Sequence, residues 1–284
     1  MIKADFSFIE YSYNSAETDL LEVERGLAKL GFVCRAHHNS ENTTLWTQDL
    51  CIMLVRDTPN VEFAGISGLG FMSNQFTIDY FKCEYDHSVE MYVTTDLAGN
   101  RILFVPDSSN TLGDMLDGNY IIDNLNYNKK EVGFNSVSGV VIDGLDRYQM
   151  DFYQELGFKF TKSGDEFNTL VSRNNRFIVK IDKRSAQRGI KGLVVDCDDV
   201  FITTSKLYVN KLDLKQLEHV SDYAAFGKHV HKIIGYNCVA AGSEASYTIE
   251  NFCMDPVPGM DITFRSRKQY LDINDNLLGM YYNG

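Results

Sequence analysis

The sequence predicts an α+β protein that is built from four β-α-β-β-β units, paired into two halves. One stretch, residues 137–182, has the pattern strand, helix, strand, strand, strand, and residues 6–55 repeat this order with closely matching spacing. Two weaker copies follow at residues 66–105 and 189–265. A single unit would leave one face of its sheet uncovered, so the copies are expected to pack against one another.

The first unit begins with a predicted strand at residues 6–12. Ser15 is expected to cap a helix that runs to Lys29, because acidic residues occupy its first turn. The helix is expected to end at the sequence Leu-Gly-Phe, residues 30–32. Two of the strands predicted to follow lie at residues 44–46 and 52–55.

The third unit repeats this plan most clearly. Residues 137–143 form an apolar run that is typical of a buried strand. An amphipathic helix is predicted over residues 146–155, and the letters LGF close it, with Gly157 at the left-handed position that ends many helices. Three short strands separated by turn residues are expected at 159–161, 168–172 and 176–182.

The second and fourth units have the same order with weaker signals. For the second, we predict strands at 66–72, 90–94 and 101–105 and a helix within 75–85. For the fourth, we predict strands at 189–196, 236–240, 247–253 and 261–265, a helix from Asp198 or Asp199 to about Tyr208, and an inserted region at 211–232. The polar stretch 124–134 separates two expected domains, residues 1–123 and 134–284.

Composition narrows the classes of function. The formal net charge of −12 argues against nucleic acid as a partner, because phosphate binding needs a basic face. No apolar run approaches the roughly 20 residues that span a bilayer, and the sequence starts without a signal peptide. The six cysteines lack the CxxC spacing of metal or redox sites. We therefore expect them to be small, buried hydrophobic residues in a reducing compartment. We therefore expect a cytoplasmic protein that binds neither nucleic acid nor membranes.

Several stretches resemble a known family. They are residues 6–11, the run from Leu30 to Gln48, residues 189–199 and the tail from Ile262 to Lys268. Together with the four units, they are similar to the vicinal oxygen chelate proteins, which include glyoxalases and extradiol dioxygenases, and in particular to the 4-hydroxyphenylpyruvate dioxygenase family. The resemblance covers the whole chain in patches. It implies two half-barrel, cup-shaped domains, with the active-site cup in the second.

The same resemblance implies an iron site, and the residues present do not suit it. The family holds ferrous iron with two histidines and one glutamate on cup-facing strands. The corresponding positions here are Gly139, Gly192 and Thr263. Glycine has no side chain, and a neutral hydroxyl replaces a carboxylate poorly. We therefore expect the fold without the iron chemistry, and no cofactor.

The other residues of the expected cup lie on its last two strands. Alternation along a strand places Asp261, Thr263 and Arg265 on one face. Glu250 corresponds to a substrate-binding glutamine of the family, and Phe252 follows two residues later. In one interpretation, Arg265 forms a structural ion pair with Asp261 or Glu250. In the other, Arg265 replaces the charge of the metal and binds a carboxylate.

Three functions remain open from the sequence. The first is a metal-independent protein that binds a small carboxylate-bearing or aromatic molecule, and the second is a dioxygenase or related metalloenzyme with a relocated site. The third is an interaction or scaffold protein. His229 and His231 alternate on a potential strand, but we interpret them, with His37, His38, His87 and His219, as solvated or edge residues. The family resemblance implies that the gating helix ends early here, which leaves either a more open cup or a lid supplied by a partner subunit. Homo-oligomerisation is also expected.

Overall fold

The computed structural model describes most of the strands that the sequence predicts. The residues described are 2–38, 42–48, 51–59, 61–106, 120–122, 134–144, 147–163, 167–174, 176–183, 189–198, 203, 237–240 and 246–269. We refer to residues 2–122 as the N-terminal half and to residues 134–269 as the C-terminal half.

The first unit has the predicted order. Its elements are β1 (Ala4–Tyr13), α1 (Leu20–Leu30), β2 (Val33–His38), β3 (Thr43–Gln48) and β4 (Cys51–Asp57). Strand β1 runs parallel to β4, and β4, β3 and β2 pair antiparallel in that order. Gly31 ends α1 with φ of 92°, as expected for the left-handed position at a helix end.

The predicted cap of α1 was wrong. Asp19, not Ser15, caps the helix, and its side chain accepts a hydrogen bond from the Leu21 amide. Residues before it form a turn instead, in which the amides of Glu17 and Thr18 both donate to the Asn14 carbonyl. The acidic residue assigned to the first helical turn is therefore the cap itself, because its carboxylate satisfies an amide that would otherwise lack a partner.

The second unit follows the same order with a shorter helix than predicted. It contains β5 (Gly65–Ser73), α2 (Gln75–Tyr80), β6 (Glu84–Asp86), β7 (Met91–Thr95) and β8 (Arg101–Pro106). The helix does not continue to residue 85, because the backbone turns at Lys82 with φ of 50° and then enters β6. A short strand, β9 (Tyr120–Ile122), pairs with β2.

The third unit confirms the strand and helix predictions within a few residues. It contains β10 (Phe134–Asp143), α4 (Arg147–Glu155), β11 (Lys159–Ser163), β12 (Phe167–Val171) and β13 (Ile178–Asp182). Strand β10 runs parallel to β13, as β1 does to β4. None of the helices in the described part of the chain is long and apolar enough to span a membrane.

The fourth unit is described only in its strands. These are β14 (Gly189–Cys197), β15 (Asn237–Ala240), β16 (Ser246–Val257) and β17 (Met260–Gln269). Strand β14 runs parallel to β17, and β17, β16 and β15 pair antiparallel. The predicted helix after residue 198 and the inserted region at 211–232 lie outside the described residues, apart from residue 203.

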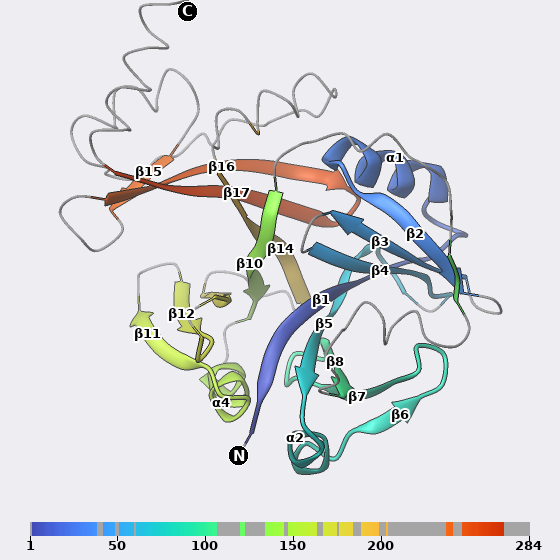
Figure 1. The fold of residues 1–284 in the computed structure, drawn as a ribbon, viewed down its shortest axis with the longest axis horizontal. Helices are drawn as coiled ribbons and strands as arrows, with labels where there is room; N and C mark the ends of the chain where they lie inside the picture. Colours follow the sequence, from blue (N-terminus) through green and yellow to red (C-terminus); the bar gives the residue numbers. More distant parts are fainter. Residues whose placement is uncertain are drawn as a thin grey trace, which may run out of the picture.

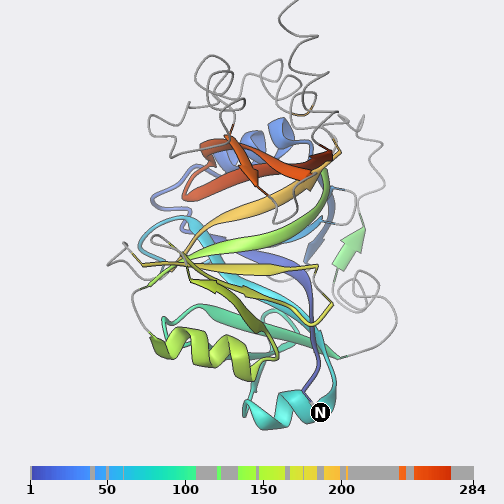
Figure 2. The same cartoon turned by 90° about the vertical axis from the view of Figure 1, so that its left-hand side faces the viewer.

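The two halves share one pairing scheme and pack together through a common core (Figures 1 and 2). In each half the first strands of two units pair antiparallel, β1 with β5 and β10 with β14. The main core cluster combines residues of both halves, such as Tyr11 and Phe71 with Leu193 and Phe264. The Phe6 ring stacks on that of Phe177 with centroids 3.9 Å apart. The core therefore lies between the halves.

A buried carboxylate also joins the halves. Asp96, in the turn between β7 and β8, is 4% exposed and accepts hydrogen bonds from Gln149 and Tyr153 of α4. Burial and the charge of Asp96 raise the pKa of Tyr153 well above its usual value. This contact fixes α4 of the C-terminal half against a turn of the N-terminal half.

The predicted burial of the cysteines is confirmed at three positions, whereas the predicted exposure of the histidines is wrong at one. Cys34, Cys51 and Cys197 are buried and not in disulfides, as expected for small hydrophobic residues. His38 is only 8% exposed, so its interpretation as a solvated residue was wrong. Strand β9 pairs beside β2 at this position and covers the edge. His37 and His87 are exposed, whereas His219, His229 and His231 lie outside the described residues.

Candidate functional site

Strand β17 presents one face to the core and the other to the inner side of the C-terminal half. Ile262 and Phe264 are buried in the main core cluster. The alternate residues Asp261, Thr263 and Arg265 are partly exposed and do not belong to that cluster. Since side chains alternate along a strand, these three share the face opposite to the core, which we call the inner face.

The structure brings the candidate positions of β10, β14 and β17 together. Gly139 lies in register with Val194, and Val194 lies in register with Thr263. On the next row, Gly192 is in register with Asp261. The positions that the family resemblance assigned to iron therefore lie on three neighbouring strands of one sheet.

Neither glycine leaves room for a side chain. A Cβ atom at Gly139 would lie 2.3 Å from Cγ1 and 2.7 Å from the carbonyl oxygen of Ile178. One at Gly192 would lie 2.7 Å from the carbonyl oxygen of Asp261. At both positions, therefore, the absence of a side chain allows a neighbouring strand to approach closely.

The residues present do not fit a ferrous ion at these positions. Iron of this type needs two imidazoles and a carboxylate, whereas the chain offers two glycines without space for a side chain and the hydroxyl of Thr263. The nearest ion pair contains an arginine, whose positive charge would repel a metal cation. Among the described residues there is also no cluster of three metal-binding side chains elsewhere.

Arg265 forms an ion pair that the sequence analysis did not identify. Its Nε lies 2.8 Å from Oδ1 of Asp196, and its Nη2 donates to Oγ of Ser138 at 2.9 Å. Ser138 Oγ in turn donates to Asp196. Among the described side chains, the acidic partner of Arg265 is therefore Asp196 and not Asp261, because parallel pairing of β14 and β17 places residues 196 and 265 side by side.

Within the described part of the chain, one edge of the guanidinium has no partner. Asp196 and Ser138 bind Nε and one hydrogen of Nη2, and no other described residue binds the guanidinium. The Arg265 side chain is 24% exposed and that of Asp196 is 40% exposed. The second edge, with Nη1 and the other hydrogen of Nη2, has the geometry that binds a carboxylate through two hydrogen bonds.

Two candidates are placed only by their backbone. Glu250 of β16 is in register with Arg265, and Phe252 is in register with Thr263. Their side chains lie outside the described part of the structure. Register alone puts Glu250 and Phe252 beside the inner-face residues of β17.

The N-terminal half contains a buried charge network on its own strands. Glu10 of β1 is fully buried, and its carboxylate binds Arg56 at 2.7 Å and Arg101 at 2.9 Å. Arg101 also binds Asp86, and Arg56 binds Ser88, whose hydroxyl donates to Asp86. The five side chains therefore form a closed ring with two acids and two arginines.

The hydrogen bonds of this ring stabilise the ionised form of Asp86. Burial alone would raise the pKa of Asp86, but hydrogen bonds from Ser88 and Arg101 lower it to about 2. The ring lies beside a second apolar cluster on the inner face of the N-terminal half, which contains Phe8, Leu54 and Leu103. The inner face of this half is thus filled by its own side chains.

Sequence reasoning missed this network because its members are far apart in the chain. Glu10 and Arg101 are separated by 91 residues. The signal that was available is alternation: Glu10 is a charged residue within an otherwise apolar first strand. Asp196 gave the same signal, since it lies four residues after Gly192 and hence on the same face of its strand.

Comparison with solved structures shows that this chain shares its fold with two proteins. A triple mutant of 4-hydroxymandelate synthase from Streptomyces coelicolor matches with a TM-score of 0.70 and 12% identity, over 93% of each chain. A xylose isomerase-like TIM barrel/4-hydroxyphenylpyruvate dioxygenase fusion protein matches with a TM-score of 0.69 and 13% identity, over 93% of this chain. The chain spans about half (48%) of the fusion protein's length.

These matches confirm the predicted resemblance at the level of fold. No family model matches the sequence, and no curated protein sequence matches it either. The structure is a sheet-rich fold with few helices, like that of 4-hydroxymandelate synthase and the dioxygenase fusion protein.

Proposed function

We propose that this chain is a metal-independent member of the vicinal oxygen chelate fold, which binds a small carboxylate-bearing or aromatic molecule on the inner face of its C-terminal half. In this proposal the four units pair as two half-barrels, residues 1–123 and 134–284, in a cytoplasmic homo-oligomer. The observation that carries the proposal is Arg265, one edge of whose guanidinium binds Asp196 and Ser138 while the other meets no described residue.

The charge of the site supports an anionic ligand of limited affinity. Asp196 already neutralises Arg265, so a carboxylate would join an existing ion pair and would not meet an isolated cation. Bidentate geometry compensates for this, because two parallel hydrogen bonds to a guanidinium are stronger than neutral ones. A flat ring attached to the carboxylate would lie along the strands toward Thr263, which is in register with Val194 of β14.

The names of the matched proteins agree with this ligand class only in outline. One is named for 4-hydroxymandelate and the other for 4-hydroxyphenylpyruvate, both aromatic acids. We propose that this chain retains recognition of an aromatic acid and has no iron reaction. Binding would then depend on Arg265 and not on a metal.

A thermal-shift screen of aromatic acids tests the proposal, because a ligand that binds only the folded state raises its stability. We expect phenylpyruvate or a related acid to raise the melting temperature of the wild-type protein, and expect Arg265→Ala to abolish the shift. Arg176→Ala, which removes an exposed arginine of the same half, is the matched control and should retain it. A shift that survives Arg265→Ala would overturn the role of Arg265, and the absence of any shift would favour a scaffold function.

A further inference from the structure

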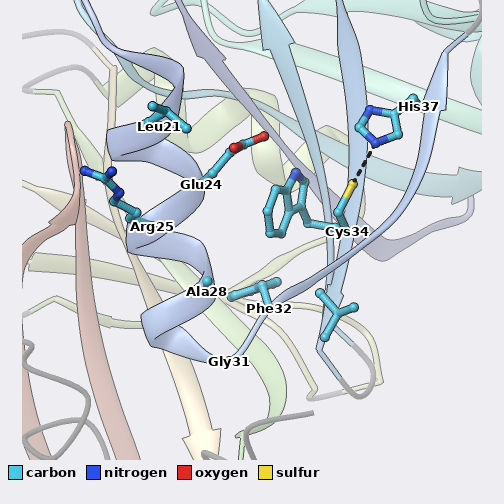
Figure 3. A pocket seen from close by; sticks show the side chains of 10 residues that line it. Leu21, Glu24, Arg25, Ala28, Gly31, Phe32, Cys34 and His37 are labelled. Carbon is cyan, nitrogen blue, oxygen red and sulfur yellow. Dashed lines mark hydrogen bonds between the residues drawn. The ribbon is translucent and has the colours of Figure 1, made fainter. Parts of the chain in front are cut away.

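A cavity lies beside helix α1 of the N-terminal half. It has a volume of about 380 Å³ and lies between helix α1 and strands β2 and β3 (Figure 3). Trp46 lines it and belongs to the main core cluster, whereas its neighbour Leu45 belongs to the inner cluster of the N-terminal half. Since neighbours on a strand point to opposite faces, this cavity lies on the outer face of the sheet.

The size and lining of the cavity suit a small molecule. Pockets for small ligands span about 300–1,000 Å³ and combine apolar walls with a few polar groups. Phe32 and Trp46 form part of the wall. The indole nitrogen of Trp46 donates to Oγ1 of Thr44 at 2.9 Å, so the polar edge of the ring is already bonded within its own strand.

The charged groups of α1 are arranged asymmetrically around the cavity. Figure 3 shows Glu24 extending from the helix toward the strand with Cys34 and His37, whereas Arg25 extends to the other side of the helix. Glu24 is partly buried, and within the described part of the chain it makes no hydrogen bond or ion pair. Cys34 and His37 contact each other, with Sγ and Nε2 3.7 Å apart.

The surroundings of Glu24 are negative. Burial raises the pKa of Tyr13 to about 12, and the charges of Asp57 and Glu24 add to this effect. The whole chain carries a formal net charge of −12. Arg25 also lines the cavity, but its side chain extends to the other side of the helix. An incoming cation is therefore attracted at long range by the net charge and, on the side of α1 that faces the strands, by Glu24.

We propose that this cavity binds an organic cation, an ammonium group attached to an apolar body, with the ammonium between the Glu24 carboxylate and the Trp46 ring and the apolar body against Phe32. An ammonium gains from a carboxylate and from the face of an indole at the same time. A carboxylate ligand would meet Glu24 as a like charge. This ligand class is opposite in charge to the one proposed for the C-terminal half, so the two sites are independent.

Fluorescence of Trp46 reports on the cavity directly, because it is the one tryptophan of the chain. The full-length protein is titrated with phenylbutylamine, phenylbutanol and phenylbutanoate, which share an apolar body and differ in charge. We expect the amine to change Trp46 emission at a concentration about 10-fold lower than the alcohol, and expect the acid to be weaker still.

Matched variants separate the role of Glu24 from general attraction of cations. Glu24→Gln should bring the amine to the affinity of the alcohol, whereas Glu22→Gln, an equal loss of charge at an exposed site of α1, should leave the preference intact. Arg265→Ala should not affect the amine titration. Equal affinities for the three compounds, equal effects of the two glutamate variants, or no change in emission up to about 10 mM ligand would each overturn the proposal.

Discussion

The row of residues across β1, β5 and β8 in the N-terminal half corresponds to the row across β10, β14 and β17 in the C-terminal half. Phe8 is in register with Gly70, and its ring fills the space where a Cβ of Gly70 would lie. The corresponding pair in the C-terminal half is Gly139 with Val194. One sheet therefore carries a large ring on its inner face where the other carries a bare backbone.

The acidic residues of the two halves also differ in how deeply they are buried. Glu10 is fully buried between two arginines, whereas the Asp196 side chain is 40% exposed and binds one arginine. Both carboxylates of the N-terminal network are bound by arginines, whereas the ion pair of Arg265 is partly exposed. The same strand arrangement thus supports a fully buried carboxylate in one half and a partly exposed ion pair in the other.

The largest expected effect is the loss of Glu10. Glu10→Gln leaves Arg56 and Arg101 without their shared counter-charge in a buried position, which typically costs about 3–5 kcal/mol of stability. Urea denaturation of the variant measures this loss. Asp196→Asn is the matching change in the C-terminal half, and equal losses in the two variants would contradict the distinction between the halves.

A smaller effect is expected from adding a methyl group at the paired glycines. Gly139→Ala and Gly192→Ala each force a neighbouring strand to move, at a cost of about 1–3 kcal/mol. Gly144→Ala serves as the control, since a Cβ there meets nothing within 4 Å. Melting curves compare the three variants, and a neutral Gly139→Ala would show that the β10–β13 contact is not tight.

The charge ring of the N-terminal half predicts a dependence of stability on acid. The folded-state pKa of Asp86 is about 2, below its usual value of 3.8, so its ionised form stabilises the fold above about pH 4 and this contribution is lost as the pH falls toward 2. The contribution is up to about 2 kcal/mol. Asp86→Asn should reduce the change in unfolding free energy between pH 4 and pH 2, whereas an unchanged pH profile would assign the acid sensitivity to other carboxylates.

The smallest effect on stability is expected at the candidate site itself. Asp196→Asn weakens an ion pair that is partly exposed, and such pairs contribute about 0–1 kcal/mol. Its effect on ligand binding should be larger than its effect on folding, since Asp196 positions Arg265. Calorimetric titration with phenylpyruvate measures the change in affinity, and a melting curve of the same variant measures the change in stability. A large loss of stability without a change in affinity would make the pair purely structural.

The sequence predicted most of the strands because alternation and the LGF helix ends are local signals. It failed at one local choice, the cap of α1, and at contacts that connect distant parts of the chain. We predicted Ser15 as the cap of α1, whereas the structure has Asp19, and both residues are common caps only four positions apart. The partner of Arg265 was missed because Asp196 lies on a strand 69 residues away, and only strand pairing brings the two together.

The site was predictable as a set of positions and not as a set of contacts. The resemblance located Gly139 and Gly192, and the structure adds that neighbouring backbone occupies the space beside them. The cavity beside α1 had no local signature, since Glu24 and Trp46 come from different elements and meet only when the helix packs on the sheet.

The dependence of ligand binding on iron tests the central claim most directly. Calorimetric titration of phenylpyruvate is performed on protein treated with a chelator and on protein supplied with one equivalent of ferrous iron. The account predicts the same dissociation constant in both conditions and a loss of at least about 10-fold in Arg265→Ala. Binding that appears only with stoichiometric iron would contradict it.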